Sequence, residues 1–215
     1  MMFTSEHKPS LGPKIFVIGV LSLAVASGLL IPYNINGDQV HRIFMLSFAV
    51  IYILRLSATL FVFLKRKMSW GEAILISIVM SVILIVFFNY GRRQSSSINA
   101  ADIIGIVLYL CGSCLNTFSE YQRYVWKKKP QNRGHLYTQG LFRFSMHINY
   151  FGDVVLFTGF ALVTHNIALL LIPLLMMLNF VVVLIPSLDE YLESRYSREF
   201  QEYANRTKKF VPCIY

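Results

Sequence analysis

Apolar blocks of about 20 residues run through this chain of 215 residues and constrain its fold more than any other feature. An α-helix needs roughly 20 apolar residues to cross the hydrocarbon core of a bilayer. Hydrophobic residues make up 55% of the chain and charged residues only 14%, which is too little charge to cover a soluble domain. Because lipid cannot satisfy backbone polar groups, helices are the expected spanning elements. The sequence therefore predicts an all-α integral membrane protein.

We expect a bundle of about six transmembrane helices. The polar tripeptide Thr164-His165-Asn166 divides the longest apolar block into a fifth and a sixth span, of which the fifth is the shortest. The apolar blocks are residues 15–32, 43–64, 73–89, 100–118 and 150–186. We place the first three helices in an N-terminal part, residues 1–99, and the last three in a C-terminal part, residues 100–215.

The distribution of basic residues predicts the orientation. Sixteen of the 20 Lys and Arg residues fall on the side of the N-terminus, three fall on the other side, and Arg55 lies inside the second expected helix. An excess of Lys and Arg marks the cytoplasmic side, so both termini are expected in the cytoplasm. The net charge of +9 is then explained by anionic membrane lipids, and no nucleic-acid partner is expected.

Processing and cysteine chemistry leave this picture unchanged. Ala24-Val25-Ala26 resembles a signal-peptidase site, but the apolar run continues to spanning length, which favours an uncleaved first helix. Cleavage would leave five spans and the same position of the C-terminus. Cys111 and Cys114 form a C-x-x-C pair in an apolar helix, where packing of small residues is a better interpretation than a metal or redox role. No metal site is predicted.

Aromatic and charged residues recur at helical spacing in the C-terminal tail, residues 188–210. The pattern predicts an amphipathic helix along the cytoplasmic face.

Three polar clusters interrupt the apolar pattern. The first places Asn116 and Glu120 four residues apart on one helix face, which Arg123 and Lys127 continue. Such a face can bind a cofactor, with its cations on phosphates. The alternative is a hydrated helix end in which Glu120 pairs with Arg123 or Tyr124.

The second cluster crowds five polar side chains into eleven residues at the start of the fifth span: Arg143, His147, Asn149, Tyr150 and Asp153. Ionisable groups at this depth are costly and mark functional sites. A purely structural interpretation has Asn149 cap a helix whose first turn holds Asp153. Capping does not explain the crowding, so a functional site is favoured.

The third cluster is Arg55 alone, inside the second span. A charge at this position must face the bundle interior or a wet cavity. A structural salt bridge to Asp153 or Glu120 and a contact with substrate or cofactor are both consistent with the sequence.

Three segments of the C-terminal part together resemble one enzyme family. They are Asn116-x-x-x-Glu120, the run G-L-F-R-F-S-M-H-I-N-Y-F-G-D at residues 140–153, and the tail with Tyr196, Tyr203, Arg206 and Thr207 before Phe210-Val211-Pro212. The pattern is similar to that of the steroid 5-alpha-reductase-like membrane enzymes, whose relatives include the isoprenylcysteine carboxyl methyltransferases. Met146 and Ile148 replace an Arg and a Pro of many relatives.

The resemblance implies NADPH-dependent reduction of a carbon–carbon double bond in a lipid-soluble, steroid- or isoprenoid-like enone. The cofactor supplies the hydride and the protein supplies orientation and charge. Catalytic residues are not assigned, because the family's proton-donating residues have no match here. The expected cofactor-binding residues are Asn116, Glu120, Arg123, Lys127, Arg143, His147, Asn149, Tyr150, Asp153, Tyr196, Tyr203 and Arg206.

Two alternatives remain open at this point. The core His147-x-Asn149-Tyr150-x-Gly152 also resembles the H-P-x-Y-x-G motif of the methyltransferases. It would then serve S-adenosylmethionine-dependent methylation of an isoprenylcysteine-type carboxylate. A non-enzymatic, lipid-binding membrane protein is the second alternative. The sequence decides neither the substrate nor the oligomeric state.

Overall fold

The computed structural model describes residues 10–30, 39–91 and 97–214, and every regular element in these ranges is helical. The α-helices are α1 (Leu11–Leu30), α2 (Gln39–Ala58), α3 (Trp70–Gly91), α4 (Ala100–Lys128), α5 (Ile148–Leu162), α6 (Leu171–Asn179), α7 (Ile185–Tyr196) and α8 (Arg198–Arg206). Short π-helical or 3-10 segments lie between them: η1 (Thr59–Phe63), η2 (Pro130–Asn132), η3 (Gly140–Arg143), η4 (Ile167–Leu170) and η5 (Phe180–Leu184).

Five helical stretches are long and apolar enough to cross a membrane. They are Leu11–Gly28, Gln39–Phe63, Trp70–Gly91, Ala100–Lys128 and Ile167–Tyr196. No more than a third of the apolar core of each stretch is buried inside the molecule, so many of its apolar side chains are open to contact with lipid. The chain is an integral membrane protein. As predicted, the break at residues 163–166 separates a short helix, α5 with 15 residues, from the last span.

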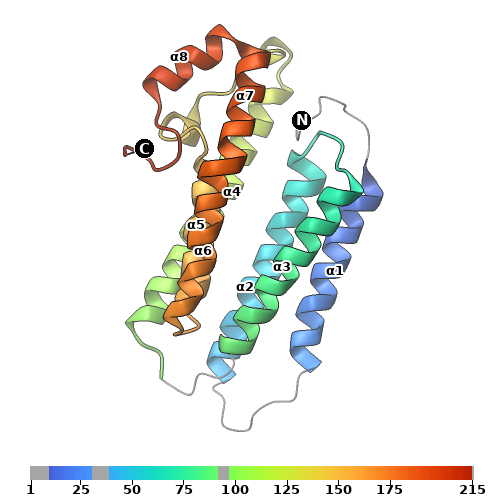
Figure 1. Ribbon diagram of the computed structural model, residues 1–215, viewed down its shortest axis with the longest axis vertical. Helices are drawn as coiled ribbons and strands as arrows, with labels where there is room; N and C mark the ends of the chain where they lie inside the picture. The colour runs from blue at the N-terminus through green and yellow to red at the C-terminus, as the bar shows by residue number, and fades with distance from the viewer. Residues whose placement is uncertain (1–9, 31–38, 92–96, 215) are drawn as a thin grey trace.

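The helices form an elongated bundle with two distinct ends (Figure 1). At one end lie the connection 129–147 and helices α7 and α8; we call this the polar end. At the opposite end α2 and α4 begin and α5 ends. Helices α1 to α3 lie together on one side of the bundle, and α4 to α6 lie together on the other. Helix α1 begins at the polar end, and the last described residues of the chain also lie there.

Glycines let α4 and α5 approach until their backbones touch. A Cβ atom at Gly112 would lie 2.3 Å from Leu156 N, and one at Gly159 would lie 2.4 Å from Tyr109 N. A Cβ at Gly152 would lie 2.7 Å from Asn116 N. Small residues drive such helix pairing because lipid provides no hydrophobic force between helices. This contact brings the first two polar clusters of the sequence together.

Polar contacts join α2 to the α4–α5 pair. Tyr109 donates a hydrogen bond from its hydroxyl to the Phe48 carbonyl, and the two rings stack with centroids 3.9 Å apart. Nearer the polar end, Arg55 Nη2 lies 2.8 Å from Asp153 Oδ1. These contacts hold the two sides of the bundle in one register.

The C-terminal tail differs from the single amphipathic helix expected over residues 188–210. The helix breaks at Ser197, whose φ of 41° lies in the left-handed region, so α7 and α8 are separate helices. After α8 the chain returns to the start of α5, where Met146 N donates to Lys208 O at 2.8 Å and His147 N donates to Lys209 O at 3.0 Å. The break allows this return, which a continuous helix would prevent.

The cysteines also differ from expectation. Cys111 and Cys114 are exposed on the outer face of α4, and it is Gly112 between them that packs against α5. The prediction that the two cysteines provide the packing surface was therefore wrong.

Candidate functional site

A chain of polar contacts crosses the α4–α5 interface near the polar end. Asn116 Nδ2 donates to the Asn149 carbonyl at 2.9 Å, and Asn149 Nδ2 donates to Glu120 Oε1 at 2.9 Å. Glu120 in turn forms an ion pair with Arg123 through Oε2. The sequence analysis named all four of these residues as candidate site residues. The close approach of α4 and α5 at their glycines explains how residues so distant in sequence meet. Asn149 is not a helix cap, since α5 begins at Ile148.

One buried hydrogen-bond acceptor in this row of polar contacts lacks a partner among the described residues. Asn116 is only 6% exposed, and its Oδ1 accepts no hydrogen bond within the described part of the chain. A buried, unpaired acceptor is unfavourable, and it is commonly explained by a missing ligand or water. The site thus has polar capacity that the protein itself does not use.

The polar chain opens onto a pocket of about 190 Å³ at the polar end. Phe63, Tyr124 and Glu120 contribute to its wall. Four cations line the same pocket: Lys65, Arg123, Lys127 and Lys128. Four positive charges around one carboxylate leave a positive surplus, so the pocket is suited to an anionic ligand. Two of the cations, Lys65 and Lys128, lay outside the predicted site; both belong to basic runs visible in the sequence, but their convergence depends on the fold.

Lys127 connects this pocket to α7. Its Nζ donates to the Tyr196 hydroxyl at 3.0 Å and to the His135 carbonyl at 2.6 Å. It also lies 5.0 Å from the centroid of the Tyr196 ring. Tyr196 was predicted to belong to the same site as Lys127, and the structure places the two side chains together.

A buried arginine, Arg55, and a partly buried aspartate, Asp153, form an ion pair beside the chain of polar contacts. Arg55 Nη2 lies 2.8 Å from Asp153 Oδ1, and Arg55 Nε has no hydrogen-bond partner within the described residues. The pairing agrees with the salt bridge that the sequence left open for Arg55. Both interpretations of Asp153, as a structural partner and as a cofactor contact, remain compatible with this position.

His147 and Tyr150 contact the last span, His147 through Asp189 of α7 and Tyr150 through the Phe180 ring of η5. His147 Nε2 lies 2.8 Å from Asp189 Oδ1, and Lys209 Nζ lies 3.0 Å from Asp189 Oδ2. The His147 ring stacks on Tyr150 with centroids 5.8 Å apart. Asp189 was missed by the sequence analysis, although it is the first acidic residue after the last apolar block and signals the emergence of that span from lipid.

Three other predicted residues lie at the periphery. Tyr203 donates a 2.5 Å hydrogen bond from its buried hydroxyl to Phe142 O, and burial raises the pKa of this phenol. Arg206 donates to Thr138 Oγ1 at 3.0 Å. Arg143 is exposed and lies over the Phe144 ring. The structure does not join these three side chains to the chain of contacts from Asn116 to Arg123.

Glu199 on α8 contacts the connection 129–147 beside the pocket. It accepts a 2.7 Å hydrogen bond from Leu136 N and lies 2.7 Å from His135 Nδ1. The backbone bond from Leu136, followed by the contact with His135, lowers the pKa of the Glu199 carboxyl. The carbonyl of His135 is the one that accepts from Lys127, so α8 holds one wall of the site.

The chain belongs to the DUF1295 family. The family, described as a protein of unknown function, matches residues 67–207, and it includes steroid 5-alpha-reductase-like proteins. Within the match lie α3 to α8 and all the predicted cofactor-binding residues. A similar curated protein is named "Probable O-methyltransferase ustE", from Ustilaginoidea virens, and is 33% identical over 94 residues. These residues are 43% of this chain and 33% of the relative, so the match spans about a third of the relative's length.

Proposed function

We propose that this DUF1295 protein is an NADPH-dependent reductase of a carbon–carbon double bond in a lipid-soluble enone. The observation that carries the proposal is the chain of polar contacts from Asn116 to Arg123, in which Asn116 and Glu120 are buried and which opens onto a pocket lined by four cations. NADPH carries three phosphate groups, and the excess of positive charge matches them. S-adenosylmethionine carries no phosphate and is itself cationic at sulfur, so its charge is less complementary to a cationic pocket.

The residues fit the groups of a dinucleotide by their chemistry. Arg123 and Lys127, with Lys65 and Lys128, would bind phosphate through charge-assisted hydrogen bonds. The free Oδ1 of Asn116 accepts hydrogen bonds, as a carboxamide or hydroxyl donor requires. NADPH would supply a hydride to the enone.

The membrane accounts for the substrate class. Helices α1 to α4 and α6 present apolar side chains outward, so a lipid-soluble molecule reaches the bundle through the bilayer. With both termini in the cytoplasm, the polar end faces the soluble pool of the cofactor. No described residue is assigned as proton donor.

Methyl transfer from S-adenosylmethionine is the second candidate. The name of the Ustilaginoidea virens relative favours it. The same pocket would then bind the carboxylate of the cofactor or of the substrate through its cations.

Ligand titration of the detergent-purified protein decides between the two. NADPH and S-adenosylmethionine are titrated separately, and binding is followed by the rise in melting temperature, since only a ligand of the folded state stabilises it. We expect Lys127→Ala to weaken NADPH binding on the order of 10- to 100-fold, corresponding to about 1.5–3 kcal/mol for a charged hydrogen bond.

Lys129→Ala is the matched control, because Lys129 is an exposed cation two residues further on that does not line the pocket. It should leave NADPH binding unchanged. Saturable S-adenosylmethionine binding with no response to NADPH would reject the reductase and support the methyltransferase.

A further inference from the structure

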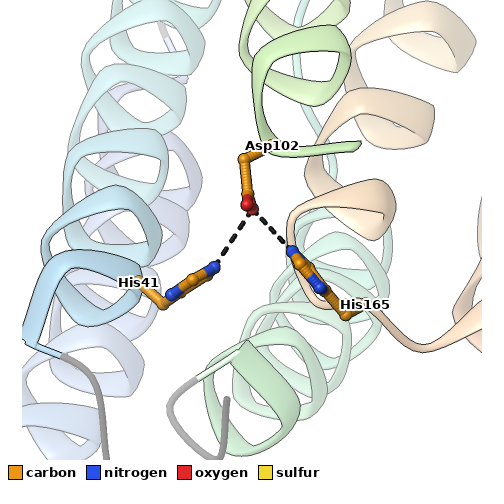
Figure 2. Close-up of side chains that lie close together, drawn as sticks. All are labelled: His41, Asp102 and His165. Atoms are coloured by element: carbon orange, nitrogen blue, oxygen red, sulfur yellow. Dashed lines mark hydrogen bonds and ion pairs between the residues drawn. The ribbon is translucent and has the colours of Figure 1, made fainter. Parts of the chain in front are cut away.

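Two histidines and an aspartate converge at the end of the bundle opposite the pocket. His41 lies in the first turn of α2, Asp102 in the first turn of α4, and His165 in the corner between α5 and η4. Figure 2 shows the two imidazole rings approaching the same carboxylate from opposite sides. His41 Nε2 lies 3.1 Å and His165 Nε2 lies 2.7 Å from Asp102 Oδ1.

We propose that this cluster is a binding site for a divalent metal ion of the zinc class. The three ligand atoms lie within 4.8 Å of one another. Zinc takes imidazole nitrogen and carboxylate oxygen at about 2.0–2.2 Å, which places neighbouring tetrahedral ligands roughly 3.3 Å apart. The distance from His41 to Asp102 is already close to this value. The contact between His165 and Asp102 has to open by about 0.6 Å, a small rotation of a ring in a corner.

Helix capping explains only one oxygen of Asp102. Oδ2 accepts a 3.0 Å hydrogen bond from Asn99 N, and the Asn99 side chain caps α4 in return. This capping box satisfies the helix start without any histidine. Oδ1 is left to two imidazoles, and a buried carboxylate oxygen with two converging ring nitrogens is a ligand set for a cation.

The local backbone supports this interpretation independently. His165 has a φ of 54°, a left-handed conformation that is unfavourable for a side chain with a Cβ atom. Strain of this kind persists where a side chain must be aimed, and here it directs the ring at Asp102. Asn99 Nδ2 lies 3.4 Å from His165 Nδ1, on the ring nitrogen away from the site. Outer partners of this kind orient the histidine ligands of metal ions.

Burial and access fit a bound ion rather than a surface cluster. The side chains of His41 and Asp102 are 0% exposed, whereas His165 is 15% exposed and forms the side from which an ion and a water ligand can enter. Three protein ligands leave a fourth tetrahedral position for that water. The ion would fasten α2 to α4 and to the corner after α5, and so join the two sides of the bundle.

The test uses the full chain, purified in detergent with a tag that contains no histidine and stripped of metal by a chelator. Co²⁺ is titrated as a spectroscopic substitute for Zn²⁺, because tetrahedral Co²⁺ absorbs in the visible range. We expect one ion per chain and a melting temperature that rises with Zn²⁺ concentration. In His41→Gln and His165→Gln the affinity should fall by more than the roughly 10- to 100-fold that loss of a supporting partner costs.

His135→Gln is the matched control, since His135 is an exposed histidine that also lies beside a carboxylate, Glu199. It should bind Co²⁺ as wild type does. The chelator-stripped wild type alone can also reject the proposal. If it binds no Co²⁺ and melts at the same temperature with and without Zn²⁺, the proposal is overturned. Unchanged binding in both His41→Gln and His165→Gln overturns it as well.

Discussion

At the residue scale, the pair of Arg55 and Asp153 shows how a charge is tolerated inside this bundle. Arg55 is 8% exposed and Asp153 is 21% exposed in their side chains, so both have lost most of their water. Attraction between two desolvated charges offsets the cost of burial only while both are present. The sequence identified Arg55 as a group that requires a partner, and the fold selected Asp153 rather than Glu120.

Removing one member of this pair should cost more stability than removing both. We expect Asp153→Asn to lower the free energy of unfolding by about 3–5 kcal/mol, because it leaves a buried guanidinium without its counter-charge. The double variant Arg55→Met with Asp153→Leu should lose less than either single variant. Denaturant titration of all three measures this, and additive losses would show that the two charges do not interact.

At the scale of elements, the glycine contact between α4 and α5 is the feature on which the site depends. A methyl group at Gly112 meets the backbone of Leu156, which cannot move aside as a flexible side chain can. The helices must then separate, and the bond from Asn116 to the Asn149 carbonyl lengthens with them.

Gly112→Ala is therefore expected to destabilise the protein by about 1–3 kcal/mol, the usual cost of overpacking. NADPH binding should weaken in the same variant. The control is Gly19→Ala, where a Cβ atom meets nothing within 4 Å. Thermal unfolding and NADPH titration measure both effects, and equal behaviour of the two variants would contradict this role of the contact.

The contact of α8 with residues 135 and 136 predicts a pH dependence. The carboxyl of Glu199 has a pKa below its ordinary value of 4.5, so its contribution is present at higher pH and is lost as the pH falls below 4.5. Acidification should therefore weaken the contacts of Glu199 with Leu136 and His135 and expose the Leu136 amide to solvent. The protection factor of the Leu136 amide, which is the exchange rate corrected for its intrinsic dependence on pH, is compared at pH 7 and pH 4. The difference in protection factor between the two pH values should disappear in Glu199→Gln; a difference that persists would assign it to another group.

At the scale of the whole molecule, the two ends of the bundle divide the chemistry between them. The polar end holds the cationic pocket and the return of the C-terminal tail, while the opposite end holds His41, Asp102 and His165. The two sites lie at opposite ends of α4, so a change at one can be tested without contact with the other.

The orientation of the bundle predicts which side of the membrane exposes Cys213. This cysteine is exposed near the C-terminus, and we expect a membrane-impermeant thiol reagent to label it only from the cytoplasmic side. Cys111 and Cys114 lie within an apolar span and should stay unlabelled, because thiolates do not form in lipid. Labelling of right-side-out and inverted vesicles measures this, with Cys213→Ser as the control. Labelling from the outer side would reverse the predicted topology.

The sequence by itself determined the membrane class, the helical fold and most of the polar side chains of the site. Apolar length and the lack of water in lipid leave helices as the structure for such blocks, so the spans and the break after α5 followed directly. Asn116 and Glu120 share a helix face by spacing alone. These two residues could be named as candidate site residues without knowing which helix packs against them.

Only the tertiary structure decided which of these groups meet. The contact between Asn149 and Glu120, the convergence of Lys65 with Lys128, and the cluster around Asp102 each join segments that are far apart in the chain. Local spacing fixes the face of a helix on which a side chain lies. It does not fix which helix packs against that face, because that depends on close approach at positions such as Gly112, where the absence of a side chain decides the contact.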